Sequence, residues 1–185
     1  MWMSDRPRTQ QRLAIDLSDL VAACHSDNKL AFLRAFWVTM AREWTKIDVL
    51  RMDKFLLLVR RYLAATFSHL ASTKWDEQQV AEHMLIIHET PLAPRDSKIS
   101  NGLRYHVLDI YVDELDKSDD REHGEIPLEL LLGPLRKLKE NSPVKVVRKR
   151  AADALEDVRL SDWQRLEPSE AEGKTGDEES AEEED

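Results

Sequence analysis

The hydrophobic residues of the chain recur every three to four positions through most of its length, in segments separated by short polar breaks. This spacing places apolar side chains on one face of an α-helix. The pattern predicts about seven helices, at residues 9–24, 28–45, 49–71, 76–89, 103–117, 127–140 and 143–158. Glycine (5) and proline (7) are scarce, which argues against a β-rich fold with many tight turns. The sequence therefore predicts an all-α fold.

Polar residues before several of these segments are suited to cap the helices that follow. The expected N-caps are Asp27, Asp48, Asp76 and Ser142. Asp76 is followed three residues later by Gln79, a spacing typical of a capping box. Gly133 and Pro134 are expected to disturb the sixth helix, because proline lacks the N–H that an interior helical position donates.

Helices of this length with short breaks favour stacked helix pairs, as in a HEAT-like α-solenoid. An irregular helical bundle is the alternative, and no clean sequence repeat distinguishes the two. We expect one helical-repeat domain over residues 1–165. The apolar residues 1–3 have no preceding cap, so they are expected to be the end of a helix whose beginning lies outside this chain.

The negative net charge of the chain resides in its C-terminal residues. The net charge of the whole chain is −9. Residues 167–185 contain ten acidic residues and one basic residue, which accounts for all of this charge. The remaining residues, 1–166, contain 26 of each sign and are neutral overall. Residues 166–185 are therefore expected to form a disordered acidic tail, since they have no large apolar side chain to bury. The neutral body remains compatible with an anionic partner.

The sequence contains no recognisable catalytic, cofactor or metal-binding motif. Its histidines lack metal-ligand spacing, its glycines are too isolated for a phosphate loop, and it has no apolar run long enough to span a membrane. The single cysteine, Cys24, lies on an apolar helix stripe and is expected to be a buried small hydrophobe. We expect no enzymatic activity, no cofactor, no small-molecule substrate and no membrane partner.

A tryptophan-rich corner between the second and third predicted helices is the most unusual stretch. Trp37 and Trp44 are seven residues apart and therefore share a helix face, as core aromatics commonly do. The residues assigned to this structural motif are Trp37, Trp44, Asp48, Arg51, Asp53 and Lys54. Within it, Asp48 is expected to cap the third helix, and Arg51 and Lys54 to pair with Asp48 and Asp53. The alternative is a surface for RNA or a partner helix.

Two basic features could contact nucleic acid. Arg60 and Arg61 lie outside the apolar stripe of their helix, and residues 135–150 contain seven basic residues against one acid. The candidate phosphate contacts are Arg60, Arg61, Lys145, Arg148, Lys149 and Arg150. A solvated helix face and a nuclear-import signal are the alternatives for residues 135–150.

Several motifs in the chain resemble the eukaryotic nucleolar ribosomal RNA processing protein 1 family. They occupy residues 1–7, 36–37, 42–44, 47–48, 51, 53–55, 60–61, 101–110 and 126–130, and the resemblance extends over about residues 1–160. It implies a helical-repeat scaffold in the nucleus and nucleolus that joins early precursors of the large ribosomal subunit. The implied partners are pre-ribosomal RNA and other large-subunit assembly factors.

Three functions remain open at the level of sequence. The first is a non-enzymatic assembly factor for pre-ribosomal RNA processing that contacts RNA through its basic helix faces. The second is a protein–protein adapter without direct RNA contact. The third, a metal-dependent hydrolase, needs a ligand cluster that the sequence does not contain.

Overall fold

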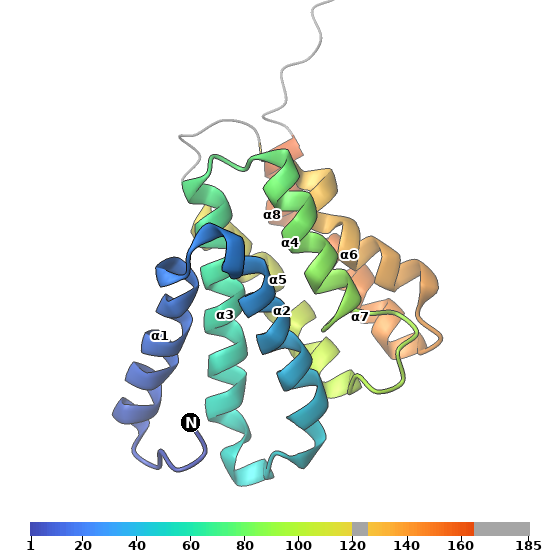
Figure 1. Cartoon of the computed structure of the whole chain (residues 1–185). Helices are drawn as coiled ribbons and strands as arrows, with labels where there is room; N and C mark the ends of the chain where they lie inside the picture. The colour runs from blue at the N-terminus through green and yellow to red at the C-terminus, as the bar shows by residue number, and fades with distance from the viewer. Residues whose placement is uncertain (120–125, 165–185) are drawn as a thin grey trace, which may run out of the picture.

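The structure is a computed structural model that describes residues 1–119 and 126–164. The described residues form eight α-helices and two short 3₁₀ turns, with no strand among them (Figure 1). The helices are α1 (Pro7–Ala23), α2 (Ser26–Glu43), α3 (Met52–Ser72), α4 (Glu77–Glu89), α5 (Asn101–Ser118), α6 (Leu128–Asn141), α7 (Lys145–Leu155) and α8 (Val158–Gln164). The 3₁₀ turns are η1 (Trp44–Lys46) and η2 (Val49–Arg51), between α2 and α3. The predicted all-α class is confirmed.

The helices form two layers. Helices α1, α3, α5 and α7 pack against one another in that order, and α2, α4 and α6 form a second row beside them (Figure 1). Alternation of successive helices between two layers is what stacked helix pairs produce. The architecture thus agrees with the predicted stacking of helix pairs into a solenoid or bundle.

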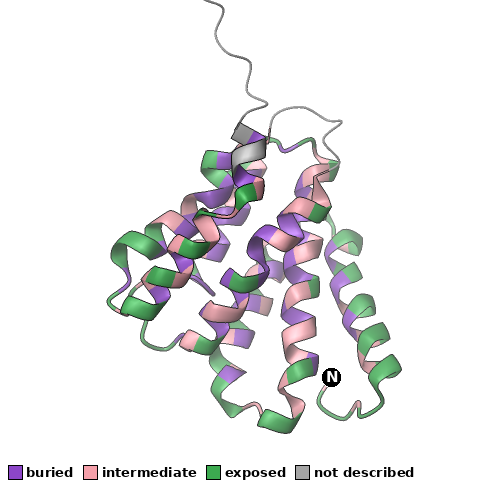
Figure 2. Ribbon diagram, turned by 180° about the vertical axis from the view of Figure 1, so that it is seen from behind, coloured by how far each residue is buried: buried purple, intermediate pink, exposed green. Residues whose placement is uncertain are grey.

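The core lies between the two layers, where the inner faces of the helices meet (Figure 2). Trp37 of α2, Phe67 of α3 and Tyr111 of α5 are among the largest fully buried side chains. The ring of Phe67 meets the ring of Tyr111 edge-on, with 5.1 Å between their centroids. This contact joins α3 to α5, and buried residues from both layers belong to one hydrophobic cluster.

Several helix ends differ from the sequence-based expectations. Helix α2 begins at Ser26 with His25 as its N-cap, so Asp27 does not cap it as predicted. Asp76 does cap α4, because its carboxylate accepts a hydrogen bond of 3.0 Å from the backbone N–H of Gln79. Cys24 is half-buried at the C-cap of α1 and is not a fully buried core residue.

The predicted last helix is two helices. Ser142 ends α6 as its C-cap, α7 starts only at Lys145, and α8 follows after a break at Glu156 and Asp157. The break is stabilised because the Asp157 carboxylate accepts a hydrogen bond of 3.0 Å from the backbone N–H of Arg159. Val158, predicted to lie on the apolar stripe, is 76% exposed as a result.

Gly133 and Pro134 do not break α6, contrary to the sequence-based expectation. Pro134 is buried inside a continuous helix. Near it, the buried hydroxyl of Tyr111 donates a hydrogen bond of 2.6 Å to the backbone carbonyl of Leu131. This tertiary contact and the burial of the proline ring favour a helical path that local propensity alone disfavours.

The two ends of the expected domain have different outcomes. Residues 1–3 are not helical; Trp2 packs near Phe55 of α3, with 6.2 Å between their ring centroids. The expected acidic tail, residues 166–185, lies outside the described residues. Among the described residues, no helix is both long and apolar enough to cross a lipid bilayer.

The turn between α3 and α4 contains two consecutive residues in the left-handed backbone region. Lys74 and Trp75 have φ angles of 55° and 56°. Trp75 is buried in the core, whereas Lys74 is exposed. A side chain with a Cβ atom is strained in this region, and glycine is not.

Replacing Lys74 with glycine is therefore expected to raise the free energy of unfolding by about 1 kcal/mol. The Lys74 side chain is exposed, so its loss removes no core contact. Urea denaturation followed by circular dichroism measures the change. Gln78→Gly, at an exposed position of α4, is the matched control and is expected to lower stability. A Lys74→Gly variant that is less stable than the wild type would contradict the strain argument.

A lysine and two histidines meet where α2, α3 and α4 come together. The ammonium of Lys29 lies 3.2 Å from Nδ1 of His69, whose ring centroid is 5.4 Å from that of His83. Burial, followed by the nearby charges of Lys29 and His83, lowers the pKa of His69 to about 4. His69 is therefore neutral at pH 7 and can accept the Lys29 hydrogen bond.

The stability of the fold is expected to fall as the pH drops from about 6.5 toward about 4. In this window the unfolded chain takes up a proton at His69, whereas the folded chain does not. Urea midpoints at pH 7.5 and pH 4.5 should therefore differ less in His69→Gln than in the wild type. Equal differences in the two proteins would show that His69 contributes nothing to the acid sensitivity.

Candidate nucleic-acid interface

The tryptophan corner is part of the core. Trp37 and Trp44 are 1% and 4% exposed. The Trp44 indole packs against the start of α5, where a side-chain carbon at Gly102 would lie only 3.1 Å from its ring nitrogen. Asp48 does not cap α3 as predicted; it caps η2, the turn before α3, by accepting a hydrogen bond of 2.9 Å from the backbone N–H of Leu50. The two indoles are therefore enclosed, and offer no stacking surface for bases.

The charged residues of this corner have partners other than those expected. Lys54 is buried, and its ammonium donates hydrogen bonds of 2.9 and 2.8 Å to the backbone carbonyls of Trp2 and Ser4. Arg51 lies over the ring of Trp2, 4.5 Å from its centroid. The predicted pairing of Arg51 and Lys54 with Asp48 and Asp53 is thus wrong. Both cations hold the N-terminal segment instead.

Arg104, at the start of α5, was not recognised as important from sequence. It is 5% exposed, and its guanidinium donates hydrogen bonds to the backbone carbonyls of Ala93, Asp96 and Ile99. Burial lowers the pKa of Arg104, but an arginine keeps its charge in a protein. Arg104 therefore organises the loop between α4 and α5.

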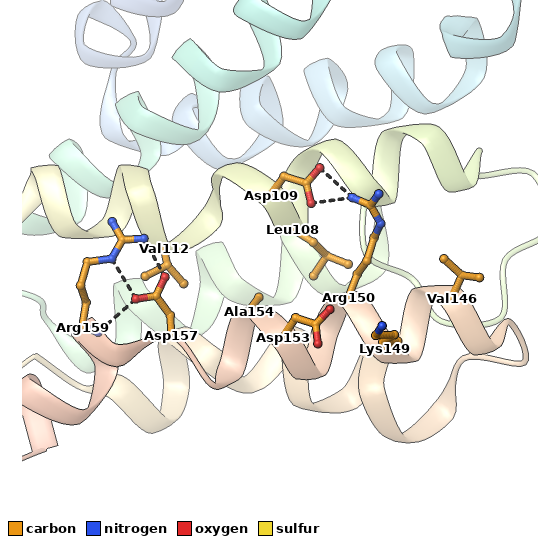
Figure 3. Close-up of a pocket in the computed structure, with 10 residues that line it drawn as sticks. All are labelled: Leu108, Asp109, Val112, Val146, Lys149, Arg150, Asp153, Ala154, Asp157 and Arg159. Atoms are coloured by element: carbon orange, nitrogen blue, oxygen red, sulfur yellow. Dashed lines mark hydrogen bonds and ion pairs between the residues drawn. The ribbon is translucent and has the colours of Figure 1, made fainter.

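The arginines of the basic α7 helix are bound within the protein. Arg150 contacts both carboxylate oxygens of Asp109 on α5, at 2.7 and 2.8 Å (Figure 3). Its guanidinium also lies over the ring of Tyr105, 4.7 Å from the centroid. Arg148 donates hydrogen bonds of 2.8 and 3.1 Å to the backbone carbonyls of Ser142 and Pro143. Both side chains therefore fix α7 against its neighbours.

Arg60 of α3 is also engaged with α5. Its guanidinium lies 2.6 Å from a Glu114 oxygen and 3.1 Å from an Asp113 oxygen. Arg159 of α8 contacts the other Asp113 oxygen at 3.0 Å. Burial acts to raise the pKa of Asp113, but hydrogen bonds and positive charge from Arg159 and Arg60 outweigh it and lower that pKa. The acidic side chains of α5 thus hold arginines from three other helices.

A groove of about 420 Å³ lies between α5 and α7 (Figure 3). Its charged lining residues are Asp109, Asp153, Asp157, Lys149, Arg150 and Arg159, three of each sign. This balance makes the groove unsuited to bind a phosphate by charge alone. Of its three cations, only Lys149 has no ion pair among the described residues.

Four exposed lysines lie on α6 and α7 at this end of the molecule. None of them has an ion-pair partner within residues 1–119 and 126–164. They are Lys137, Lys139, Lys145 and Lys149. We call this group the α6–α7 lysine surface. Arg61, on α3, is exposed but lies apart from it, beside α1.

The described part of the chain contains no cluster of three or more histidine, cysteine, aspartate or glutamate side chains able to hold a metal ion. The ion pairs of α5 have arginine partners, which leaves these carboxylates engaged with cations. The arrangement is that of a scaffold with charged surfaces.

The family model described as "Nucleolar protein, Nop52" matches residues 1–185. The chain belongs to the Nop52 family. The resemblance found in the sequence motifs is thus confirmed. In the motif at residues 101–110 of this Nop52 chain, Gly102, Arg104 and Asp109 each make a contact described above. These contacts give the motif a structural explanation.

Curated relatives carry the name ribosomal RNA processing protein 1 homolog. Homolog A of Mus musculus is 40% identical over 118 residues, which cover 63% of this Nop52 chain and 24% of the relative. Homolog B of Homo sapiens is 38% identical over 123 residues, which cover 66% of this Nop52 chain and 16% of the relative. The homolog of Caenorhabditis elegans is 37% identical over 117 residues, which cover 63% of this Nop52 chain and 29% of the relative. The matches thus span less than a third of the length of these relatives.

Proposed function

We propose that this chain is a non-enzymatic assembly factor that acts in the nucleolus on precursors of the large ribosomal subunit. The observation that carries the proposal is membership of the Nop52 nucleolar family, whose relatives are named ribosomal RNA processing proteins. The two-layer helical scaffold supports it, since such folds present extended surfaces to large partners.

The proposed contact with pre-ribosomal RNA is made first by the α6–α7 lysine surface. Lysine ammonium groups without a protein partner are free to replace counterions on a phosphate backbone. The predicted contacts at Lys145 and Lys149 belong to this surface. For Arg60, Arg148 and Arg150, phosphate contact would have to compete with partners that the protein already supplies. Arg61 stays a separate prediction.

Reversing the charge of Lys145 and Lys149 together is expected to weaken RNA binding about tenfold or more at low salt. The slope of the logarithm of affinity against the logarithm of salt concentration should become shallower by about 1.4, or about 0.7 for each lost contact with a single strand. A filter-binding or anisotropy titration with a pre-ribosomal RNA fragment at several salt concentrations measures both.

Lys98→Glu is the matched control, because Lys98 is an exposed lysine on the loop before α5. Equal salt slopes for the wild type and the Lys145→Glu/Lys149→Glu variant would reject this surface as the RNA contact. A loss of the same size in the Lys98 control would show that the effect is one of net charge.

A protein–protein adapter is the second candidate function. The balanced charges and apolar floor of the α5–α7 groove favour it, since protein side chains carry both signs and RNA backbone carries one. Digestion of RNA in isolated particles separates the two functions. An adapter keeps its partners after RNA is removed, whereas an RNA-tethered factor loses them.

A further inference from the structure

A second groove lies on the other side of the molecule, between α1 and α3, which pack side by side (Figure 1). Its cavity volume is about 570 Å³. It is closed at one end by Lys29 of α2, and the rest of its lining comes from α1 and α3. No residue of this groove takes part in the contacts proposed for RNA except Arg61.

The floor of the groove is formed by small side chains. Ala64, Ala65, Ser68 and Ser72 lie along one side of α3, turned away from the core residues Leu63 and Phe67. Beside them, α1 contributes Ile15, which is 40% exposed. In this stripe Ser68 and Ser72 are exposed and the two alanines are half-buried. Such small side chains allow another helix to approach closely, because no long side chain stands between the two backbones.

Two positive charges at the groove have no acidic partner among the described residues. Arg61 is exposed and has no ion pair there, and the ammonium of Lys29 contacts only the neutral ring of His69, at 3.2 Å. His69 and Arg61 are eight residues apart on α3, so the two charges lie about 12 Å apart along the helix axis. Asp19 is the single acidic residue of the groove lining.

We propose that this groove docks an acidic amphipathic helix of a partner protein. Two carboxylates about two turns apart on that helix would meet Arg61 and Lys29. Small side chains between the carboxylates would lie on Ala65 and Ser68, and an aliphatic side chain would cover Ile15. The inference goes beyond the assembly role and does not depend on RNA binding.

The groove chemistry favours a protein helix over a nucleic acid. No phenylalanine, tyrosine or tryptophan side chain lines the groove, and its one ring, that of His69, already contacts Lys29 and His83, so bases would have little surface on which to stack. Asp19 can accept a hydrogen bond from a polar side chain of the docked helix, next to the two carboxylates that meet Arg61 and Lys29. An alanine floor gains from apolar contact and not from a solvated phosphate backbone.

The probe for the test is a fluorescent, alanine-rich helical peptide of about 18 residues, with one leucine and with two glutamates seven residues apart. Its binding to the full chain is followed by fluorescence anisotropy. Ser68→Trp fills the groove at an exposed position and is expected to weaken binding at least tenfold. Ser97→Trp, at an exposed position of the loop before α5 and outside the groove, is the matched control and should leave the affinity within twofold.

A charge swap separates specific docking from general attraction. Arg61→Glu is expected to weaken binding of the peptide about tenfold. A peptide in which the glutamate facing that position is replaced by lysine should recover most of this loss. Since Arg61 and Ser68 are both exposed, the variants should keep the wild-type circular dichroism spectrum and melting temperature.

Three outcomes would overturn the proposal. The first is that the wild type does not bind the peptide, and the second is that Ser68→Trp binds it as tightly as the wild type. The third is a single-stranded RNA that displaces the peptide and itself loses affinity in Ser68→Trp, which would make the groove a nucleic-acid site. None of these results depends on whether the α6–α7 lysine surface binds RNA.

Discussion

Replacing Arg104 with leucine is expected to lower the free energy of unfolding by about 3–5 kcal/mol. The guanidinium fills its buried site with hydrogen bonds of 2.6 to 2.8 Å to the carbonyls of Ile99, Asp96 and Ala93 and to the side chain of Asn101. Leucine would leave these oxygens without the donors that the buried guanidinium supplies. The loss of stability follows from these unsatisfied acceptors. Leucine also replaces only part of the volume of the arginine side chain.

Urea denaturation followed by circular dichroism measures the effect of Arg104→Leu. Arg95→Leu is the matched control, because Arg95 is an exposed arginine of the same loop. Arg104→Lys keeps the charge but not the planar set of donors, so it should lose about half as much stability. Equal unfolding midpoints for the Arg104 and Arg95 variants would show that the guanidinium does not hold the loop.

Replacing Trp44 with alanine is expected to lower the free energy of unfolding by about 3–5 kcal/mol. The indole is buried between the end of α2 and the start of α5, next to Gly102 and beside the ring of His106. Alanine would leave a cavity at this junction, and the backbone on both sides is fixed by helix hydrogen bonds, so collapse around it is limited.

The Trp44 result has an internal comparison within the same protein. Trp2→Ala removes an indole that is 43% exposed, and it should cost no more than about 1–2 kcal/mol. Hydrogen exchange of the first turn of α5 should increase in Trp44→Ala and remain unchanged in Trp2→Ala. A Trp44 variant that loses less stability than the Trp2 variant would show that the corner does not support α5.

The helices were predictable because the signals that define them are local. Asp76 lies three residues before the N–H that it caps, and the apolar stripe with Trp37 and Trp44 repeats at helical spacing. Such features depend only on neighbouring residues. The layer order was predictable only as a class, because stacked pairs and irregular bundles share the same amphipathic pattern.

The misassigned elements are those where a distant contact overrides local preference. Pro134 predicts a disturbed helix, yet α6 is continuous beside the buried hydroxyl of Tyr111. The last predicted helix shows the opposite case, a break where none was expected. The apolar pattern through Val158 predicts one helix, whereas Asp157 caps a new one. A residue 20 positions away in sequence, as Tyr111 is from Leu131, leaves no local signal.

The candidate RNA contacts show the same limit for charged side chains. The sequence groups Arg148, Lys149 and Arg150 as one basic run, because it shows charge but not partners. In the fold, Arg150 binds Asp109, which is 41 residues away, and Arg148 donates to two backbone carbonyls, so only Lys149 is without such a partner among the described residues. Arg104 was overlooked for the related reason that a lone basic residue in a helix resembles a surface residue until its burial is known.

The enclosed ammonium of Lys54 makes this residue chemically distinct from the surface lysines. An amine that donates to two carbonyls and has 3% of its side chain exposed is shielded from acylating reagents. Lys145 and Lys149, in contrast, stand in solvent and would be modified at once. Slow acylation of the protein, followed by mass spectrometry, would therefore measure the rate at which Lys54 is labelled. Its labelling rate would report how often residues 1–5 lift from α3.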